Sequence, residues 1–202
     1  MSSRPLITCL AAAALLSGAC ASKRVLVPPF LDVSPYGRVG LVTFTTENAK
    51  GGLNSLATEY FAEQVLAAQP IEILELGELE QLLAEVGRSE VDIEALKAIG
   101  AAYDVPILFL GDLQVSGVEP RASLSALRVE ATITVQAGVR LVSTESGGSI
   151  WRESARITDR VGHLGWTGGI PDFSAEDPEK AYGPLVEALA HELTRDFRPT
   201  YR

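Results

Sequence analysis

The residue types best suited to catalysis or metal binding are scarce in this chain of 202 amino acids. It holds two histidines, and neither completes a known motif. His191 and Glu192 begin the zinc-protease pattern H-E-x-x-H, but Arg195 stands in place of the second histidine. His163 has neither a cysteine nor a carboxylate pair at ligand spacing. We therefore expect no metal ion at either histidine.

Other chemistry-bearing motifs are also absent from the sequence. It contains neither the G-x-S-x-G turn of hydrolases nor the G-x-x-x-x-G-K-[ST] phosphate loop. The acidic residues Glu176, Asp177 and Glu179 do not follow the spacing of an EF-hand, and they are interpreted as a solvated loop before a helix. The sequence thus predicts no catalytic residue, no metal ligand and no cofactor, and hence a protein that is not an enzyme.

The amino-terminal segment has the order of parts typical of a secretory signal peptide. Arg4 supplies a positive charge, residues 6–16 form an apolar run of eleven residues, and Ser17-Gly18-Ala19 are small. The apolar run is too short to cross a bilayer, which takes roughly 20 residues. We therefore interpret residues 1–19 as a signal peptide that is removed before Cys20.

The residues around the expected cleavage site carry a family resemblance. Leu16-Ser17-Gly18-Ala19-Cys20 resembles the lipobox of bacterial lipoproteins. The resemblance implies that the sulfur of Cys20 receives a diacylglycerol and that the new amino group is acylated, for example with palmitate. Several acyl chains are needed, because one chain binds a membrane only marginally. The residue after Cys20 is Ala21 and not Asp, which implies the outer membrane with the domain in the periplasm. The alternative is an ordinary signal peptide whose last cysteine is incidental.

Composition limits what the mature chain can bind. Cys9 leaves with the signal peptide and Cys20 is consumed by lipid, so no disulfide or zinc–thiolate site can form. The formal net charge of −9 opposes binding to nucleic acid, because the phosphate backbone is itself anionic. With a hydrophobic content of 47%, the chain can bury a substantial core. We expect no nucleic-acid partner and a membrane contact made through the lipid.

The mature chain divides into a tether and one domain. Residues 20–37 form the lipidated amino terminus and a tether that contains three prolines and a terminal glycine. Fully extended, the 17 residues after Cys20 reach about 55–60 Å. Apolar residues such as Phe30 and Leu31 indicate that part of the tether packs on the domain. Residues 38–202 are expected to form a single periplasmic α/β domain.

Periodicity of the apolar residues predicts the elements of this domain. Three strands are expected, at residues 39–45, 71–76 and 105–111. Three helices are expected between them, at residues 53–68, 79–86 and 92–99. An antiparallel hairpin follows at residues 127–142 and 150–157, and then a C-terminal helix that starts or kinks at Gly183-Pro184. The order β-α-β-α-α-β, hairpin, helix predicts an α/β fold with a three-layer-like mixed sheet.

Three segments extend the resemblance to the fold. Residues 39–44, 99–111 and 140–151, in this order of elements, resemble a lipoprotein superfamily over residues 38–199. The superfamily includes the curli-secretion channel subunit, the lipoprotein activators of penicillin-binding proteins and the amino-terminal domain of TolB. The resemblance implies a fold like that of anticodon-binding domains. It also implies that the chain acts by binding other envelope proteins.

One segment is a candidate partner-binding loop. Residues 162–173 mix glycines with the large apolar side chains of Trp166, Ile170 and Phe173. Loops carry binding residues more often than core elements do, and Trp is favoured at interaction hot spots. The alternative is that these three side chains fold back and cover one edge of the sheet.

Two classes of function remain from the sequence. The first is a lipid-anchored, non-catalytic envelope lipoprotein that binds a protein partner in cell-envelope assembly, secretion or peptidoglycan synthesis. The second is a small ligand-binding or hydrolytic lipoprotein whose site is assembled from dispersed residues. A pocket with convergent titratable groups would favour the second class. The identity of the partner and the formation of oligomers are left open.

Overall fold

The computed structural model describes residues 25–47, 52–116, 119–123, 128–167, 170–173 and 178–201. Residues 1–19 and Cys20, the expected signal peptide and lipidation site, lie outside the described residues. The chain splits into two compact units. The smaller unit joins Met1–Pro28 to Pro199–Arg202, and in it β1 (Leu26–Val27) pairs with β10 (Thr200–Tyr201) as antiparallel strands. The larger unit, Pro29–Arg198, contains every other element.

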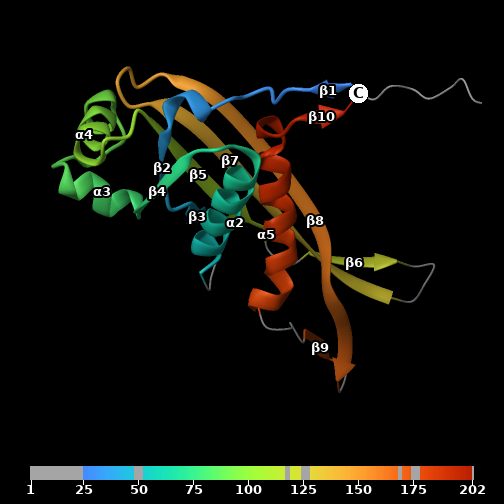
Figure 1. The fold of residues 1–202 in the computed structure, drawn as a ribbon. Helices are drawn as coiled ribbons and strands as arrows, with labels where there is room; N and C mark the ends of the chain where they lie inside the picture. Colours follow the sequence, from blue (N-terminus) through green and yellow to red (C-terminus); the bar gives the residue numbers. More distant parts are fainter. Residues whose placement is uncertain are drawn as a thin grey trace, which may run out of the picture. The chain divides into compact units, whose positions relative to one another are not determined.

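A mixed sheet forms the centre of the larger unit (Figure 1). The strand order is β4-β2-β5-β7-β8-β9, while β3 pairs with β5 and β6 pairs with β7. β2 lies parallel to β4 and β5, and β7 is antiparallel to both of its neighbours. The bounds are β2 (Arg38–Val42), β3 (Thr45–Glu47), β4 (Glu72–Gly77), β5 (Ile107–Val115), β6 (Glu119–Ser123), β7 (Arg128–Ser143), β8 (Ser149–Thr167) and β9 (Ile170–Phe173). The predicted α/β class with a mixed sheet and an antiparallel hairpin is confirmed.

The helices form where apolar periodicity predicts them. They are α2 (Leu53–Ala68), α3 (Leu79–Glu85), α4 (Ile93–Tyr103) and α5 (Pro178–Leu193), with short 3-10 turns η1 (Ser34–Tyr36) and η2 (Arg195–Phe197). Asp92 caps α4 by accepting a hydrogen bond from the Ala95 amide at 2.6 Å. α5 begins at Pro178 and not at Gly183-Pro184, because proline suits a first turn whose amide has no partner. No helix in the described part of the chain is long and apolar enough to span a membrane.

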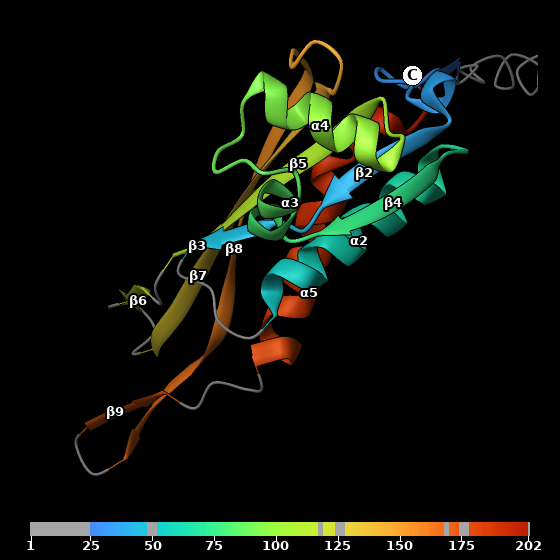
Figure 2. The same ribbon diagram turned by 90° about the vertical axis from the view of Figure 1, so that its left-hand side faces the viewer.

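The main core lies between one face of the sheet and the helices α2 and α5 (Figure 2). Alternate residues of the strands point to this face, since side chains alternate across a strand. Phe109 of β5 stands at its centre, with ring centroids 5.1 Å from Phe61 and 5.8 Å from Phe197. Phe44 and Trp151 extend the row of rings at its two ends. Among the described side chains, this face of β2, β5 and β7 is therefore used for packing.

The opposite face of the sheet is covered only in part. α3 and α4 pack their apolar residues on Leu108 and Leu110 of β5 and on Val142 of β7. Further along the same strands, residues on this face are exposed, as at Asp112, Gln114 and Gln136. We call this half of the face, formed by β3, β5, β7 and β8, the open face. A wet face is common in antiparallel sheets, and here it is the surface on which the site described below lies.

Gln69 fixes the segment that leads into the domain. Its side-chain oxygen accepts a hydrogen bond from the amide of Val33 at 2.7 Å. Its nitrogen donates to the carbonyl oxygens of Leu31 at 2.5 Å and Phe197 at 3.1 Å. Val33 is fully buried and Leu31 packs against the core, whereas Phe30 is 84% exposed. The tether therefore joins the packed structure at Leu31.

Candidate functional site

The predicted partner-binding loop is a β-hairpin. β8 continues to Thr167 and β9 returns from Ile170, with Trp166 opposite Pro171 and Leu164 opposite Phe173. Residues 162–167 and 170–173 therefore form paired strands where a loop was predicted, because apolar side chains such as those of this segment also suit strands. The side chains of Trp166, Ile170 and Phe173 lie outside the described side chains, so whether they bind or pack stays a prediction.

The two histidines lie far from each other in the sequence and in different elements. The backbone of His163 is part of β8, opposite Glu130 of β7. His191 lies in the last turn of α5, with its ring against Arg198 and its Nδ1 atom 3.4 Å from the Gln64 side-chain oxygen. In the described residues no three His, Cys, Asp or Glu side chains gather as metal ligands would.

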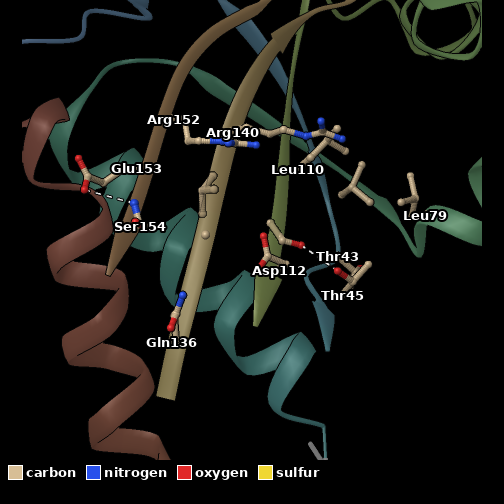
Figure 3. Close-up of a pocket in the computed structure, with 14 residues that line it drawn as sticks. Thr43, Thr45, Leu79, Leu110, Asp112, Gln136, Arg140, Arg152, Glu153 and Ser154 are labelled. Atoms are coloured by element: carbon tan, nitrogen blue, oxygen red, sulfur yellow. Dashed lines mark hydrogen bonds between the residues drawn. The ribbon is translucent and has the colours of Figure 1, made fainter. Parts of the chain in front are cut away.

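A pocket of about 450 Å³ lies on the open face (Figure 3). Its polar lining comes chiefly from Thr45 of β3, Asp112 of β5, Arg140 of β7 and Arg152 of β8. Leu79 at the start of α3 stands at its rim. Residues 45, 112, 140 and 152 belong to four neighbouring strands, so the pocket exists only when the sheet is assembled. We call it the arginine pocket.

Strand register sets the geometry of the arginine pocket. Arg140 pairs with Leu110 on one side and with Arg152 on the other, so the two arginines are direct cross-strand neighbours. Two residues along, Asp112 stands opposite Gly138. A Cβ atom at Gly138 would lie 2.9 Å from the Asp112 carboxylate oxygen, closer than real Cβ contacts allow. The missing side chain at position 138 therefore leaves room for the Asp112 carboxylate within the pocket.

The two arginines are not neutralised by neighbours. Among the described residues neither Arg140 nor Arg152 forms a salt bridge or a hydrogen bond, whereas other arginines pair with carboxylates on the surface. Like charges directly opposite each other on paired strands are destabilising. The chain nevertheless places two cations together while carrying a formal net charge of −9. The pocket thus holds two neighbouring cations on an acidic protein, and Asp112 and Glu153 also line it.

The surroundings of Asp112 shift the pKa of its carboxyl above the ordinary value. Burial raises the pKa of the Asp112 carboxyl, and repulsion from Glu47 raises it further. Attraction to Arg152 and, more weakly, to Arg140 lowers the pKa, but the net shift is upward. The loss of hydration at this carboxylate therefore outweighs the attraction of the arginines.

Two neighbouring arginine side chains are suited to binding an anion. A guanidinium presents a planar fork that matches a carboxylate or a phosphate. Nucleophilic catalysis needs a hydroxyl or thiol held by a base, but the Thr45 hydroxyl donates weakly to the Gly111 carbonyl at 3.4 Å. In the described part of the chain no side-chain hydroxyl forms a hydrogen bond with Asp112. That catalysis is absent stays a prediction.

The sequence contained a signal for this site that the analysis of motifs missed. Alternation in the hairpin already placed Arg140 on its polar side. Pairing β7 with β8 around the turn at residues 144–148 brings Arg140 opposite Arg152, and β5 then adds Asp112. The position of Asp112 beside the arginines can be predicted only when the order of the strands in the sheet is known, because Asp112 lies some 30 residues earlier in the chain.

Comparison with known proteins finds similarity in solved structures alone. No family model matches the chain, and no curated protein matches it. PelC from Paraburkholderia phytofirmans, solved as a dodecamer, is 12% identical with a TM-score of 0.47 over 87% of this chain and 97% of PelC. Lipoprotein GNA1162 from Neisseria meningitidis is 17% identical with a TM-score of 0.45, over 78% of this chain and 98% of that one.

A third structure extends the same set. The C-terminal domain of LpoB from Escherichia coli is 13% identical with a TM-score of 0.38, over 63% of this chain and 87% of that domain. The structures similar to this chain thus include bacterial lipoproteins. Since identities and TM-scores are this low, we argue the function of this protein from its own residues.

Proposed function

We propose that this protein is a lipid-anchored envelope lipoprotein whose larger unit binds a protein partner and performs no catalysis. Acyl chains on Cys20 would hold it at the outer membrane, with the domain in the periplasm. The partner would act in envelope assembly, secretion or peptidoglycan synthesis. The lipobox-like residues before Cys20 support the anchor, and Ala21 after it supports the outer membrane.

The observation that carries the binding role is the arginine pair on the open face. α3 and α4 pack on the sheet at Leu108, Leu110 and Val142, and Arg140 and Arg152 lie side by side at the border of this covered area. A surface that served only to keep the domain soluble would gain stability from a mixed arrangement of charges. The cross-strand arginine pair instead costs stability in the isolated domain. A partner that supplies negative charge would remove that cost.

Two experiments in intact cells test this proposal. Cells fed a palmitate analogue should label the wild-type chain and its Cys9→Ser variant, while Cys20→Ser should lose both the label and membrane association. A photo-crosslinking amino acid at Ser154, which lines the arginine pocket, should capture a protein that the same group at Glu63 on α2 does not. An unmodified sulfur at position 20 would refute the anchor. Identical capture from both positions would refute the binding face.

The arginine pocket also favours one form of the second function, binding of a small anionic ligand. Its volume of about 450 Å³ falls within the range of small-molecule sites. Calorimetric titration of the mature protein with inorganic phosphate and with succinate measures this directly. Binding of either with micromolar affinity, lost in Arg140→Gln, would support the small-ligand role over the protein partner.

A further inference from the structure

We propose that Arg140, Arg152 and Arg156 on the open face form a docking strip for an extended acidic segment of the protein partner. This inference rests on the binding role proposed above and adds the chemistry of the partner. We call the three residues the arginine strip. Arg140 is half-buried, and Arg152 and Arg156 are exposed.

The spacing of the strip matches an extended peptide. Arg152 and Arg156 lie four residues apart on β8 and point to the same face, so roughly 13 Å separates them along the strand. Arg140 stands beside Arg152 on the neighbouring strand, about 5 Å away at the Cβ atoms. An extended segment rises by the same amount per residue. Acidic side chains at positions i and i+4 of the partner would therefore meet the arginine pair and Arg156 together.

Neutral polar side chains occupy the surface between the charges. Ser154 lies between Arg152 and Arg156 on β8, and Gln136 on β7 stands opposite Arg156. Gly138, opposite Ser154, has no side chain, and the carboxylate of Asp112 lies over it. The side chains of Ser154 and Gln136 can donate hydrogen bonds to a peptide backbone and accept hydrogen bonds from it. The distance between the arginine pair and Arg156 is larger than a single phosphate group can span.

The lack of internal partners gives the strip its affinity for carboxylates. Within the described residues, none of the three arginines forms a salt bridge or a hydrogen bond. A partner carboxylate would meet a guanidinium fork that is already unpaired, so no internal contact has to break. The carboxylate of Asp112 lies beside the pair and would repel the incoming group. Neutralising Asp112 is therefore expected to strengthen binding.

The test uses the mature lipidated protein in detergent and a fluorescein-labelled hexaglutamate peptide. Fluorescence anisotropy at low ionic strength measures the dissociation constant. The double variant Arg140→Gln/Arg152→Gln should weaken binding by tenfold or more, and Asp112→Asn should tighten it severalfold. Arg140→Lys/Arg152→Lys should fall between, because lysine keeps the charge and loses the fork. Thermal unfolding followed by circular dichroism checks that each variant folds.

The matched control is Arg88→Gln/Lys97→Gln. It changes the net charge equally, but on exposed side chains near α3 and on α4, outside the pocket. Its dissociation constant should stay within twofold of the wild type. Equal weakening in both double variants would overturn the proposal in favour of non-specific charge attraction. Competition by inorganic phosphate at lower concentration than by unlabelled peptide would overturn it in favour of a phosphate site.

Failure of this inference differs from failure of the proposed function. If hexaglutamate does not bind the wild-type protein at all, the arginine strip is not an acidic docking site. Lipid labelling of Cys20 and crosslinking from Ser154 would still report on the anchor and the binding face. Conversely, binding of the peptide without any crosslinked protein in cells would support the chemistry of the strip and refute the face as a partner surface.

Discussion

Replacing Gln69 with alanine should strongly destabilise the larger unit. Its side chain makes three hydrogen bonds, at 2.7, 2.5 and 3.1 Å, to backbone groups of Val33, Leu31 and Phe197. Gln69 itself is only 5% exposed. The Gln69→Ala variant removes all three bonds and leaves the amide of Val33 without this partner in a buried place.

The size of the loss follows from those contacts. A hydrogen bond contributes about 1 kcal/mol net, and a buried group left unsatisfied costs about 1–3 kcal/mol. Three bonds, at least one of them to a fully buried residue, predict a loss of roughly 3–5 kcal/mol in the free energy of unfolding. For a domain of this size, each kcal/mol lowers Tm by about 2–4 °C. The variant should therefore melt at least about 6 °C below the wild type.

Urea unfolding and thermal unfolding of the mature protein, followed by circular dichroism, measure the loss. The control is Gln81→Ala, because Gln81 is exposed on α3 and should change the free energy of unfolding by less than about 0.5 kcal/mol. If Gln69→Ala stays within 1 kcal/mol of this control, Gln69 does not fix residues 31–33 to the domain. The tether would then join the fold by apolar packing alone.

Three further predictions concern the core and the pocket. Burial raises the pKa of Asp112, so ionisation of this carboxyl costs the folded state free energy. The free energy of unfolding should therefore fall as pH rises from about 4 through the native pKa. In urea unfolding, Asp112→Asn should remove this pH dependence and be more stable than the wild type at pH 7. Gly100→Ala should destabilise the protein, because the new Cβ atom would lie 2.5 Å from the Thr144 side chain, although alanine favours helices over glycine by about 1 kcal/mol. The control is Ala101→Gly at the next, exposed helix position, which should cost about 1 kcal/mol from helix propensity alone. Phe109→Ala should cost about 3–5 kcal/mol in urea unfolding, since the ring is fully buried between two others, and a loss below 1 kcal/mol would contradict this packing.

The elements of the fold could be predicted because their signals are local. Apolar spacing in residues 53–68 and the alternation in residues 127–142 each need only a short window of sequence. The structure places α2 and β7 over nearly the same residues. Strand β6 and the hairpin β8–β9 were not predicted, and in the hairpin the strand pattern was hidden by glycines, which are common in loops.

The candidate site could not be predicted in the same way. Arg140 and Arg152 each look like a solvated strand residue when they are considered singly. Their shared position depends on the register of β7 against β8, and Asp112 joins them only through β5. The raised pKa of Asp112 is a further product of this assembly, because its largest cause is burial in the folded protein.

The sequence by itself determined which segments become helices and strands, and it carries the whole basis for expecting a lipid on Cys20, since both depend on short contiguous patterns. Tertiary structure alone decided that Gln69 holds residues 31 and 197 together and that three arginines share one exposed face. The physical reason is that burial and charge pairing act through space. They become defined only when strands that are distant in the sequence take a common register, and for Gln69 and Phe197 the separation is 128 residues.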